Sequence, residues 1–139
     1  MLVRQASIAV CTGGPVEAHD VTEQVRQAVR ASGVGAGIVL VSVPHTTCAV
    51  CVNENEPGLR ADLERLGRQL LDPLHARAPF EHDRIDDNAR AHLTSVLLGH
   101  QTTPPIEAGE PVLGTWQRIF LLKLDGPRQR TLNLHILGA

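Results

Sequence analysis

The segment GIVLVSVPHTTCAVCVNE, residues 37–54, decides the fold because it holds two extended runs around a polar break. Residues 37–43 are nearly all β-branched or aliphatic, a composition typical of a strand buried on both faces. Pro44 then interrupts the strand pattern, and residues 48–52 resume it before Glu54. Polar side chains are therefore expected at both ends of a buried strand.

The residues before this segment predict a strand and a helix. Residues 3–10 have a strand pattern, and Asp20 with Glu23 forms a capping-box-like pair at the start of a helix that ends at Gly33. After the segment, Pro57 opens a second helix. Its apolar stripe, which we expect to face the core, consists of Leu59, Leu63, Leu66 and Leu70.

The second half of the chain continues with a loop over residues 73–84 and a short helix from Asp86 or Asp87 to Gly99. Residues 112–125 then predict a long strand that is apolar on both faces, with Trp116 in the core. The last strand alternates Thr131, Asn133 and His135 with Leu132, Leu134 and Ile136. We expect these two strands to form an antiparallel hairpin.

The order of elements, β-α-β-β-α-α-β-β-β, predicts an α+β protein with a mainly antiparallel sheet and about three helices. A chain of 139 residues is one ordinary domain, so we expect a single domain over residues 1–139. Because the long strand is apolar on both faces, another subunit could cover one of them.

The composition excludes several classes of protein. Thirteen Lys and Arg residues against 15 Asp and Glu give a net charge of −2, which argues against a nucleic-acid or membrane-surface partner. The start of the chain does not have a signal-peptide pattern, and no apolar stretch approaches the roughly 20 residues of a membrane span. We expect a soluble, cytoplasmic protein.

Three cysteines do not form a disulfide framework. Cys48 and Cys51 resemble a redox or zinc pair, but residues three apart in a strand point to opposite faces. Small apolar fillers are the favoured interpretation, with a metal or redox pair as the alternative.

Polar residues in the middle of the chain suggest a functional site. His45, His82 and His92 can bind a metal or transfer protons near neutral pH. They come from three different predicted elements, so their convergence in space is a hypothesis, and any single histidine is more often without a function. Asn88 and His92 are one helical turn apart and should face the same pocket.

The neighbouring residues have a possible role and an ordinary alternative. Glu54 is a candidate acid–base group or a solvated turn carboxylate, and Asn88 is a candidate partner of an imidazole or a helix cap. Thr46 and Thr47 could bind an anion, although threonines are common at strand edges. Arg128, with Arg118 and Arg130 near it in sequence, could make a forked contact to phosphate, although an exposed hairpin charge is slightly favoured.

Taken in order along the chain, these motifs resemble the YjbQ-like, or secondary thiamine-phosphate synthase, family. The matching residues are His45-Thr46-Thr47, Asn53-Glu54, His82-Asp83, Asn88 with Ala91-His92-Leu93, Leu97-Leu98-Gly99, Leu113-Gly114-Thr115-Trp116-Gln117 and Asp125-Gly126-Pro127-Arg128. The resemblance implies a β-sandwich-like core, a homotrimer, and a polar site that includes histidines and a divalent metal ion. Arg118 departs from the pattern, because a small residue is common after the Trp-Gln pair.

The resemblance also implies an activity: weak coupling of a hydroxymethylpyrimidine diphosphate to a thiazole phosphate. In this interpretation Glu54, His82 and His92 are catalytic and the three imidazoles His45, His82 and His92 hold the metal. The residues expected to bind the phosphorylated substrate are Thr46, Thr47, Asn88, Gln117 and Arg128.

The expected metal and the expected reaction do not agree. Three imidazoles favour zinc, whereas a diphosphate substrate favours magnesium held through oxygen atoms. Two alternatives therefore stay open: a metal-dependent hydrolase or lyase with Glu54 as base, and a non-catalytic protein that binds a metal or small ligand.

Overall fold

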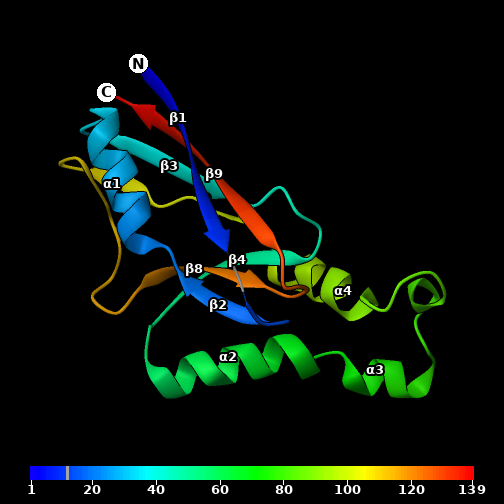
Figure 1. Ribbon diagram of the computed structural model, residues 1–139. Helices are drawn as coiled ribbons and strands as arrows, with labels where there is room; N and C mark the ends of the chain where they lie inside the picture. The colour runs from blue at the N-terminus through cyan, green and yellow to red at the C-terminus, as the bar shows by residue number, and fades with distance from the viewer. Residues whose placement is uncertain (12) are drawn as a thin grey trace.

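Two antiparallel sheets form the centre of the computed structural model, which describes residues 1–11 and 13–139 (Figure 1). The larger sheet has the order β1 (Leu2–Cys11), β9 (Gln129–Gly138), β3 (Gly37–Ser42), β6 (Pro105–Glu107) and β7 (Glu110–Pro111), with β5 (Gln101–Thr102) also paired to β3. The smaller sheet has the order β2 (Glu17–Asp20), β8 (Arg118–Lys123) and β4 (Cys48–Asn53). The α+β class and the antiparallel pairing are as predicted.

Three longer helices and two short ones complete the fold. They are α1 (Thr22–Ser32), α2 (Pro57–Gln69), α3 (Asp72–Arg77), the 3-10 helix η1 (Glu81–Arg84) and α4 (Ala89–Leu98). Figure 1 shows α1 beside the larger sheet and α2 below the smaller sheet. Within the described part of the chain, no helix has the length and hydropathy that a membrane crossing needs.

The start of α1 differs from the predicted capping box. Val21 is the N-cap residue and its side chain makes no capping bond. Asp20 instead accepts a hydrogen bond from the backbone N–H of Thr22, and Glu23 pairs with Arg26. The helix ends as expected, because Gly33 takes the left-handed conformation with φ 75° that favours glycine.

The strand β8 has two apolar faces because it lies between two hydrophobic clusters of the same chain. Ile119 and Leu121 pack in a cluster shared with the larger sheet, whereas Phe120 and Leu122 pack in a cluster with Ala91 of α4. The two faces therefore do not require a second subunit. Cys48 and Cys51 divide between the same clusters, as expected for fillers on opposite faces of β4.

Two predictions about the end of the chain are wrong. The long strand expected over residues 112–125 is shorter, because β7 ends at Pro111 and β8 covers only Arg118–Lys123. Trp116 therefore lies in the loop between these strands and is 70% exposed. The expected hairpin is also absent from the described pairings, because β8 pairs with β2 and β4 while β9 pairs with β1 and β3. The turn between them passes the chain from one sheet to the other.

Two predictions about the helices also need correction. The expected loop over residues 73–84 contains most of α3 and all of η1. The stripe of α2 is only partly covered, since Leu59, Leu66 and Leu70 are 37–39% exposed, and Leu63 alone packs against the second cluster.

Candidate functional site

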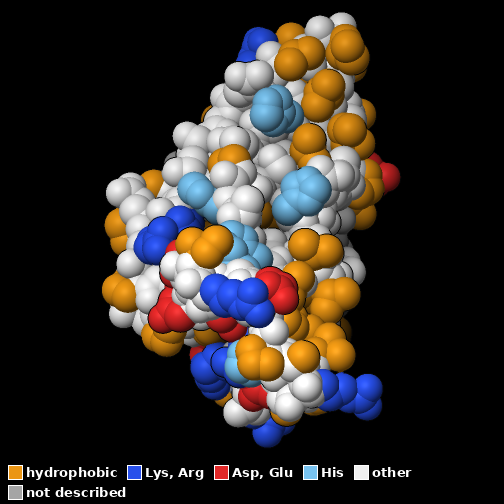
Figure 2. Space-filling view, turned by 90° about the vertical axis from the view of Figure 1, so that its right-hand side faces the viewer, with side chains coloured by type: hydrophobic (Ala, Val, Ile, Leu, Met, Phe, Trp, Pro, Cys, Tyr) orange, Lys and Arg blue, Asp and Glu red, His pale blue; other side chains and the backbone are white. Residues whose placement is uncertain are grey.

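A polar site lies where the β3–β4 connection meets the β8–β9 connection. The antiparallel register pairs Cys48 with Lys123, so the residues just before β4 and just after β8 meet at the same end of the smaller sheet. Two adjoining hollows open there and share Pro44, His45, Thr46 and His92. Figure 2 shows histidine side chains gathered on this side of the molecule, with hydrophobic side chains beside them.

The two hollows differ in chemistry. The polar hollow, of about 380 Å³, adds Thr47, Asp86, Asn88, Asp125, Arg128 and Arg130 to the shared residues. The apolar hollow, of about 610 Å³, adds Val43, Ser95, Val96, Gly99 and His100. One half is therefore suited to a charged group and the other to an apolar one.

His45 is held as a neutral hydrogen-bond donor. The backbone N–H of Thr131 donates to its Nε2 over 3.1 Å, so the proton of the neutral ring must be on Nδ1. Burial lowers the pKa of His45, and the positive charge of Arg130 lowers it further. This imidazole is therefore a fixed Nδ1–H donor.

Arg130 places a buried positive charge in the polar hollow. The residue is 8% exposed, and a terminal nitrogen of its guanidinium donates to Thr47 Oγ1 over 3.0 Å. Its Nε is buried without a hydrogen-bond partner. No carboxylate of the described residues forms an ion pair with it. A buried cation with an unsatisfied donor is a favourable place for an anion.

Asn88 connects the loops around His82 to the end of β8. Its Nδ2 donates to Asp125 Oδ2 over 3.0 Å, which directs its Oδ1 toward His82 Nε2, also at 3.0 Å. Because an amide oxygen only accepts, His82 must donate through Nε2–H. The His82 ring meets the His92 ring edge to face, with centroids 4.9 Å apart.

Arg128 is at the mouth of the same hollow. Its side chain is 57% exposed and its guanidinium is 3.7 Å from Asp125 Oδ2. Asn88 and His92 both line this hollow from the start of α4, as their helical spacing predicts, and His92 N donates to Asn88 O. The histidines, threonines, Asn88 and Arg128 are thus brought together.

The three imidazoles do not fit a shared metal site in this arrangement. The Nε2 lone pair of His45 already accepts a hydrogen bond, and His82 donates through its Nε2. Neither nitrogen of His45 can coordinate an ion while that bond persists, because the other one carries the proton. Within residues 1–11 and 13–139, no three His, Cys, Asp or Glu side chains are grouped to hold a metal.

Glu54 and Gln117 lie at the other end of the smaller sheet. Asn53 pairs with Arg118, so the residues after β4 and before β8 are together there, six residue pairs from the histidine end. A third hollow, of about 380 Å³, is lined there by Asp20, Glu54, Asn55, Glu56, Pro57, Thr115, Trp116 and Arg118. Within one chain, the structure does not bring Glu54 or Gln117 to the histidines.

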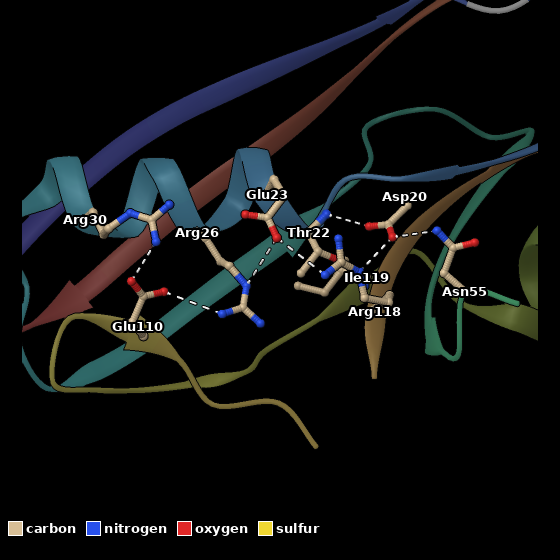
Figure 3. A network of polar contacts seen from close by, with 9 residues as sticks. All are labelled: Asp20, Thr22, Glu23, Arg26, Arg30, Asn55, Glu110, Arg118 and Ile119. Carbon is tan, nitrogen blue, oxygen red and sulfur yellow. Dashed lines mark hydrogen bonds and ion pairs between the residues drawn. The ribbon is translucent and has the colours of Figure 1, made fainter. Parts of the chain in front are cut away.

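Arg118 belongs to an ion-pair network at this second end (Figure 3). Its Nε donates to Asp20 Oδ2 over 2.7 Å, and Asn55 donates to the same oxygen. Burial alone would raise the pKa of Asp20, but the bonds from Arg118, Thr22 and Asn55 outweigh it and lower that pKa. Arg118 is therefore engaged within its own chain.

Sequence reasoning gave no role to Asp125, and it named Arg130 only as a neighbour of Arg128 in the proposed phosphate contact. A signal for Arg130 was present, because in the alternating last strand it has the parity of Leu132, Leu134 and Ile136, which face the core. An arginine that faces the core needs a polar partner there, so its position in the alternating pattern could have identified Arg130 as a candidate site residue.

The comparisons with known proteins cover nearly the whole chain. A family model described as UPF0047 protein YjbQ-like matches residues 6–139. A UPF0047 protein of Archaeoglobus fulgidus is 44% identical over 119 residues, which are 86% of this chain and 90% of that protein. The UPF0047 protein YugU of Bacillus subtilis is 32% identical over 126 residues, 88% of this chain and 90% of that protein.

Solved structures agree with this result. A YbjQ-like protein of unknown function from Sulfolobus solfataricus P2 matches with a TM-score of 0.92 and 42% identity, over 99% of this chain and 98% of that one. A hypothetical protein from Aeropyrum pernix K1 has a TM-score of 0.91 and 40% identity, over 98% of this chain and 99% of that one. The chain therefore belongs to the UPF0047, or YjbQ-like, family.

Proposed function

We propose that this protein binds a small phosphorylated compound in the polar hollow beside His45, and that its reaction is the displacement of diphosphate. The resemblance to secondary thiamine-phosphate synthases supports the choice of reaction. The hollow supports the choice of ligand, because Arg128 and Arg130 both line it. Guanidinium groups make forked contacts to phosphate.

The buried guanidinium of Arg130 is the observation that carries the proposal. Leaving a buried donor such as its Nε unsatisfied is costly, and a bound phosphate oxygen would satisfy it. The Nδ1–H of His45 can supply a neutral donor at the same hollow. Neither group needs a change of protonation to receive an anion.

The proposed reaction joins two substrates. The ring nitrogen of a thiazole phosphate attacks the methylene carbon of a hydroxymethylpyrimidine diphosphate, the carbon–nitrogen bond forms, and the carbon–oxygen bond to diphosphate breaks. The electron pair of the broken bond leaves with diphosphate. Stabilisation of this developing negative charge is the main requirement, and in this proposal Arg128 and Arg130, which line the polar hollow, supply it.

The histidines have separate roles in this proposal. His92 lies at the junction of the two hollows, where it can donate a hydrogen bond or a proton to the leaving oxygen. The ring of His82 contacts the ring of His92 and helps to position it, and Asn88 in turn holds His82 through a hydrogen bond. Thr46 and Thr47 offer hydroxyl groups to the phosphate. No step passes through a metal ion.

A divalent ion remains a prediction from the resemblance alone. Zinc would require His45 to give up its bond from Thr131, and magnesium would be expected to arrive with the diphosphate. The homotrimer and the cytoplasmic location are likewise parts of the proposal. The two apolar faces of β8 no longer support the trimer, since both are covered within the chain.

Calorimetry with inorganic diphosphate tests the ligand, and mass spectrometry of a reaction with both phosphorylated half-molecules tests the reaction. We expect diphosphate binding that the Arg130→Met variant loses and that Arg65→Met, an exposed arginine of α2, retains. Binding without product would favour the non-catalytic alternative. Binding that is absent, or equal in both variants, would contradict the proposal.

A further inference from the structure

Lys123, at the end of β8, is the single lysine of the chain, and every other basic position is an arginine. Its side chain is fully buried, with an exposed fraction of 0%. Lysines are almost never fully buried unless they are paired. An ammonium group can lose its proton in a protein, whereas a guanidinium group cannot. The only basic side chain that can become neutral is therefore also the most deeply buried one.

The amine of Lys123 contacts the backbone rather than a carboxylate. Its Nζ donates a hydrogen bond to the carbonyl oxygen of Gly14, in the connection between β1 and β2. A Cβ added at Gly126 would clash with the same Nζ, so the amine lies against the turn between β8 and β9. No carboxylate of the described residues is within ion-pair distance of it.

The carboxylates nearest to this amine are held by other groups. Glu17 pairs with Lys123 in the β2–β8 register, but it accepts hydrogen bonds from the preceding backbone and lies 2.8 Å from His19 Nε2. Asp125 accepts a hydrogen bond from Asn88 Nδ2 over 3.0 Å. The negative charges of Glu17 and Asp125 favour the ammonium form of Lys123, but neither forms an ion pair with it.

Arg130 is a second buried cation close to Lys123. On β8, Lys123 alternates with Leu132's partner in the core, Leu121, and on β9 Arg130 alternates with Leu132 itself. Both basic side chains therefore point into the space between the two sheets. Burial lowers the pKa of Lys123, and the positive charge of Arg130 lowers it further. Cys48, the β4 partner of Lys123, adds no charge, because burial raises the pKa of its thiol.

An anion in the polar hollow would change this balance. Arg130 lines the hollow, and its buried Nε has no hydrogen-bond partner. A negative charge bound there would offset the repulsion that Arg130 exerts on Lys123. Asp86 and Asp125 line the same hollow, and their carboxylates oppose an anion. A positive charge on Lys123 would counteract this opposition and so favour binding.

We propose that Lys123 is an interior cation of the anion site, and that it loses its proton in the alkaline range in the unliganded protein but keeps it when an anion is bound to Arg130. Lys123 does not line the hollow, so it acts through its charge and not by contact with the ligand. The coupling is reciprocal, because a ligand that favours the ammonium form must bind that form more tightly. The inference rests on the proposed function for its ligand.

The affinity for diphosphate should depend on pH in a defined direction. Below the lowered pKa of the free protein, Lys123 is charged with or without the ligand, and the affinity is greatest. As the pH rises through that value, the affinity should fall by up to about tenfold per pH unit, the limit for one coupled proton, and become constant above the pKa of the complex. Lys123→Met should remove this part of the pH dependence, whereas the titration of diphosphate itself is common to both proteins.

Nuclear magnetic resonance can follow the proton directly, because the chain has one lysine. Protein made with carbon-13-labelled lysine gives a single Cε signal, whose chemical shift reports the charge of the amine. We expect a titration midpoint below 10.5 in the free protein, and a rise of about one pH unit or more with saturating inorganic diphosphate. Arg130→Met should raise the midpoint of the free protein, because it removes a like charge. Arg65→Met, at an exposed position of α2, is the matched control and should not change it.

The outcomes separate this inference from the proposed function. A midpoint at or above 10.5 in the free protein would overturn the inference even if diphosphate binds. A midpoint that diphosphate does not raise, in a protein that calorimetry shows to bind it, would overturn the coupling and leave the proposed ligand intact. A lowered midpoint that rises in Arg130→Met, in a protein that binds no diphosphate, would support the interaction of the two cations and contradict the proposed ligand. Since these measurements retain Lys123, they do not depend on the folding of Lys123→Met.

Discussion

The replacement of Arg130 by Met should weaken diphosphate binding far more than the replacement of Arg128 by Met. Arg130 is 8% exposed and its Nε lacks a partner, whereas the Arg128 side chain is 57% exposed and close to Asp125. A charge-assisted hydrogen bond in a buried site contributes about 1.5–3 kcal/mol, which corresponds to roughly 10- to 150-fold in the dissociation constant. An exposed charge contributes about 0–1 kcal/mol, or up to roughly fivefold.

Calorimetric titration with inorganic diphosphate measures both changes. Added salt provides a second criterion, since screening reduces the contribution of an exposed charge more than that of a buried one. The loss of diphosphate affinity in Arg128→Met should therefore become smaller at high salt, whereas the loss of affinity in Arg130→Met should persist.

A folding control is needed because Arg130 also donates to Thr47. Thermal unfolding of each variant identifies a loss of structure, and Arg130→Lys keeps the charge while it removes the fork. We expect intermediate binding from the lysine variant. An Arg128→Met variant that loses as much affinity as Arg130→Met, in proteins that are both folded, would refute the assignment of the buried guanidinium as the main anion contact.

Three further predictions concern stability. Burial and the charge of Arg130 lower the pKa of His45 from 6.5. The contribution of neutral His45 to the free energy of unfolding should therefore be complete above about pH 6.5 and be lost as the pH falls through the lowered pKa. Urea unfolding across this pH range should show a shallower pH dependence in His45→Gln than in the unchanged protein. Gly37→Ala would place a Cβ 1.9 Å from the carbonyl oxygen of Leu137, so we expect a destabilisation of about 2 kcal/mol or more by the same measurement, and an unchanged midpoint would contradict it. Leu122→Ala empties a fully buried position and should cost about 2–5 kcal/mol in chemical denaturation, whereas a loss below that range would mean that the second cluster closes around the gap.

The sequence predicted the fold class because hydrophobic periodicity reports which faces are buried. It did not predict how β8 is covered. A strand with two apolar faces is compatible with a second subunit or with a second layer of the same chain, and here Phe120 and Leu122 pack in the cluster that includes Ala91. Which layer covers a strand is a tertiary property that local pattern does not contain.

The candidate site was predicted in part for a similar reason. His45, Asn88 and His92 converge because loops and a helix end meet at one end of the ladder. Glu54 comes from the opposite end of the same strand, and sequence proximity gave no sign of the separation. The exposure of Trp116 could not be foreseen either, because a large aromatic residue in an apolar run resembles a core residue until the run is found to be a loop.

The paired strands β4 and β8 set the distance between the two polar ends of the molecule. An inserted residue in one strand alone would shift the register and exchange its two faces, so Phe120 would turn toward the wrong cluster. The connections, such as residues 78–88 around η1, can change length without this consequence. Length variation among proteins with this architecture should therefore be concentrated in the connections, while the six-pair ladder keeps its length.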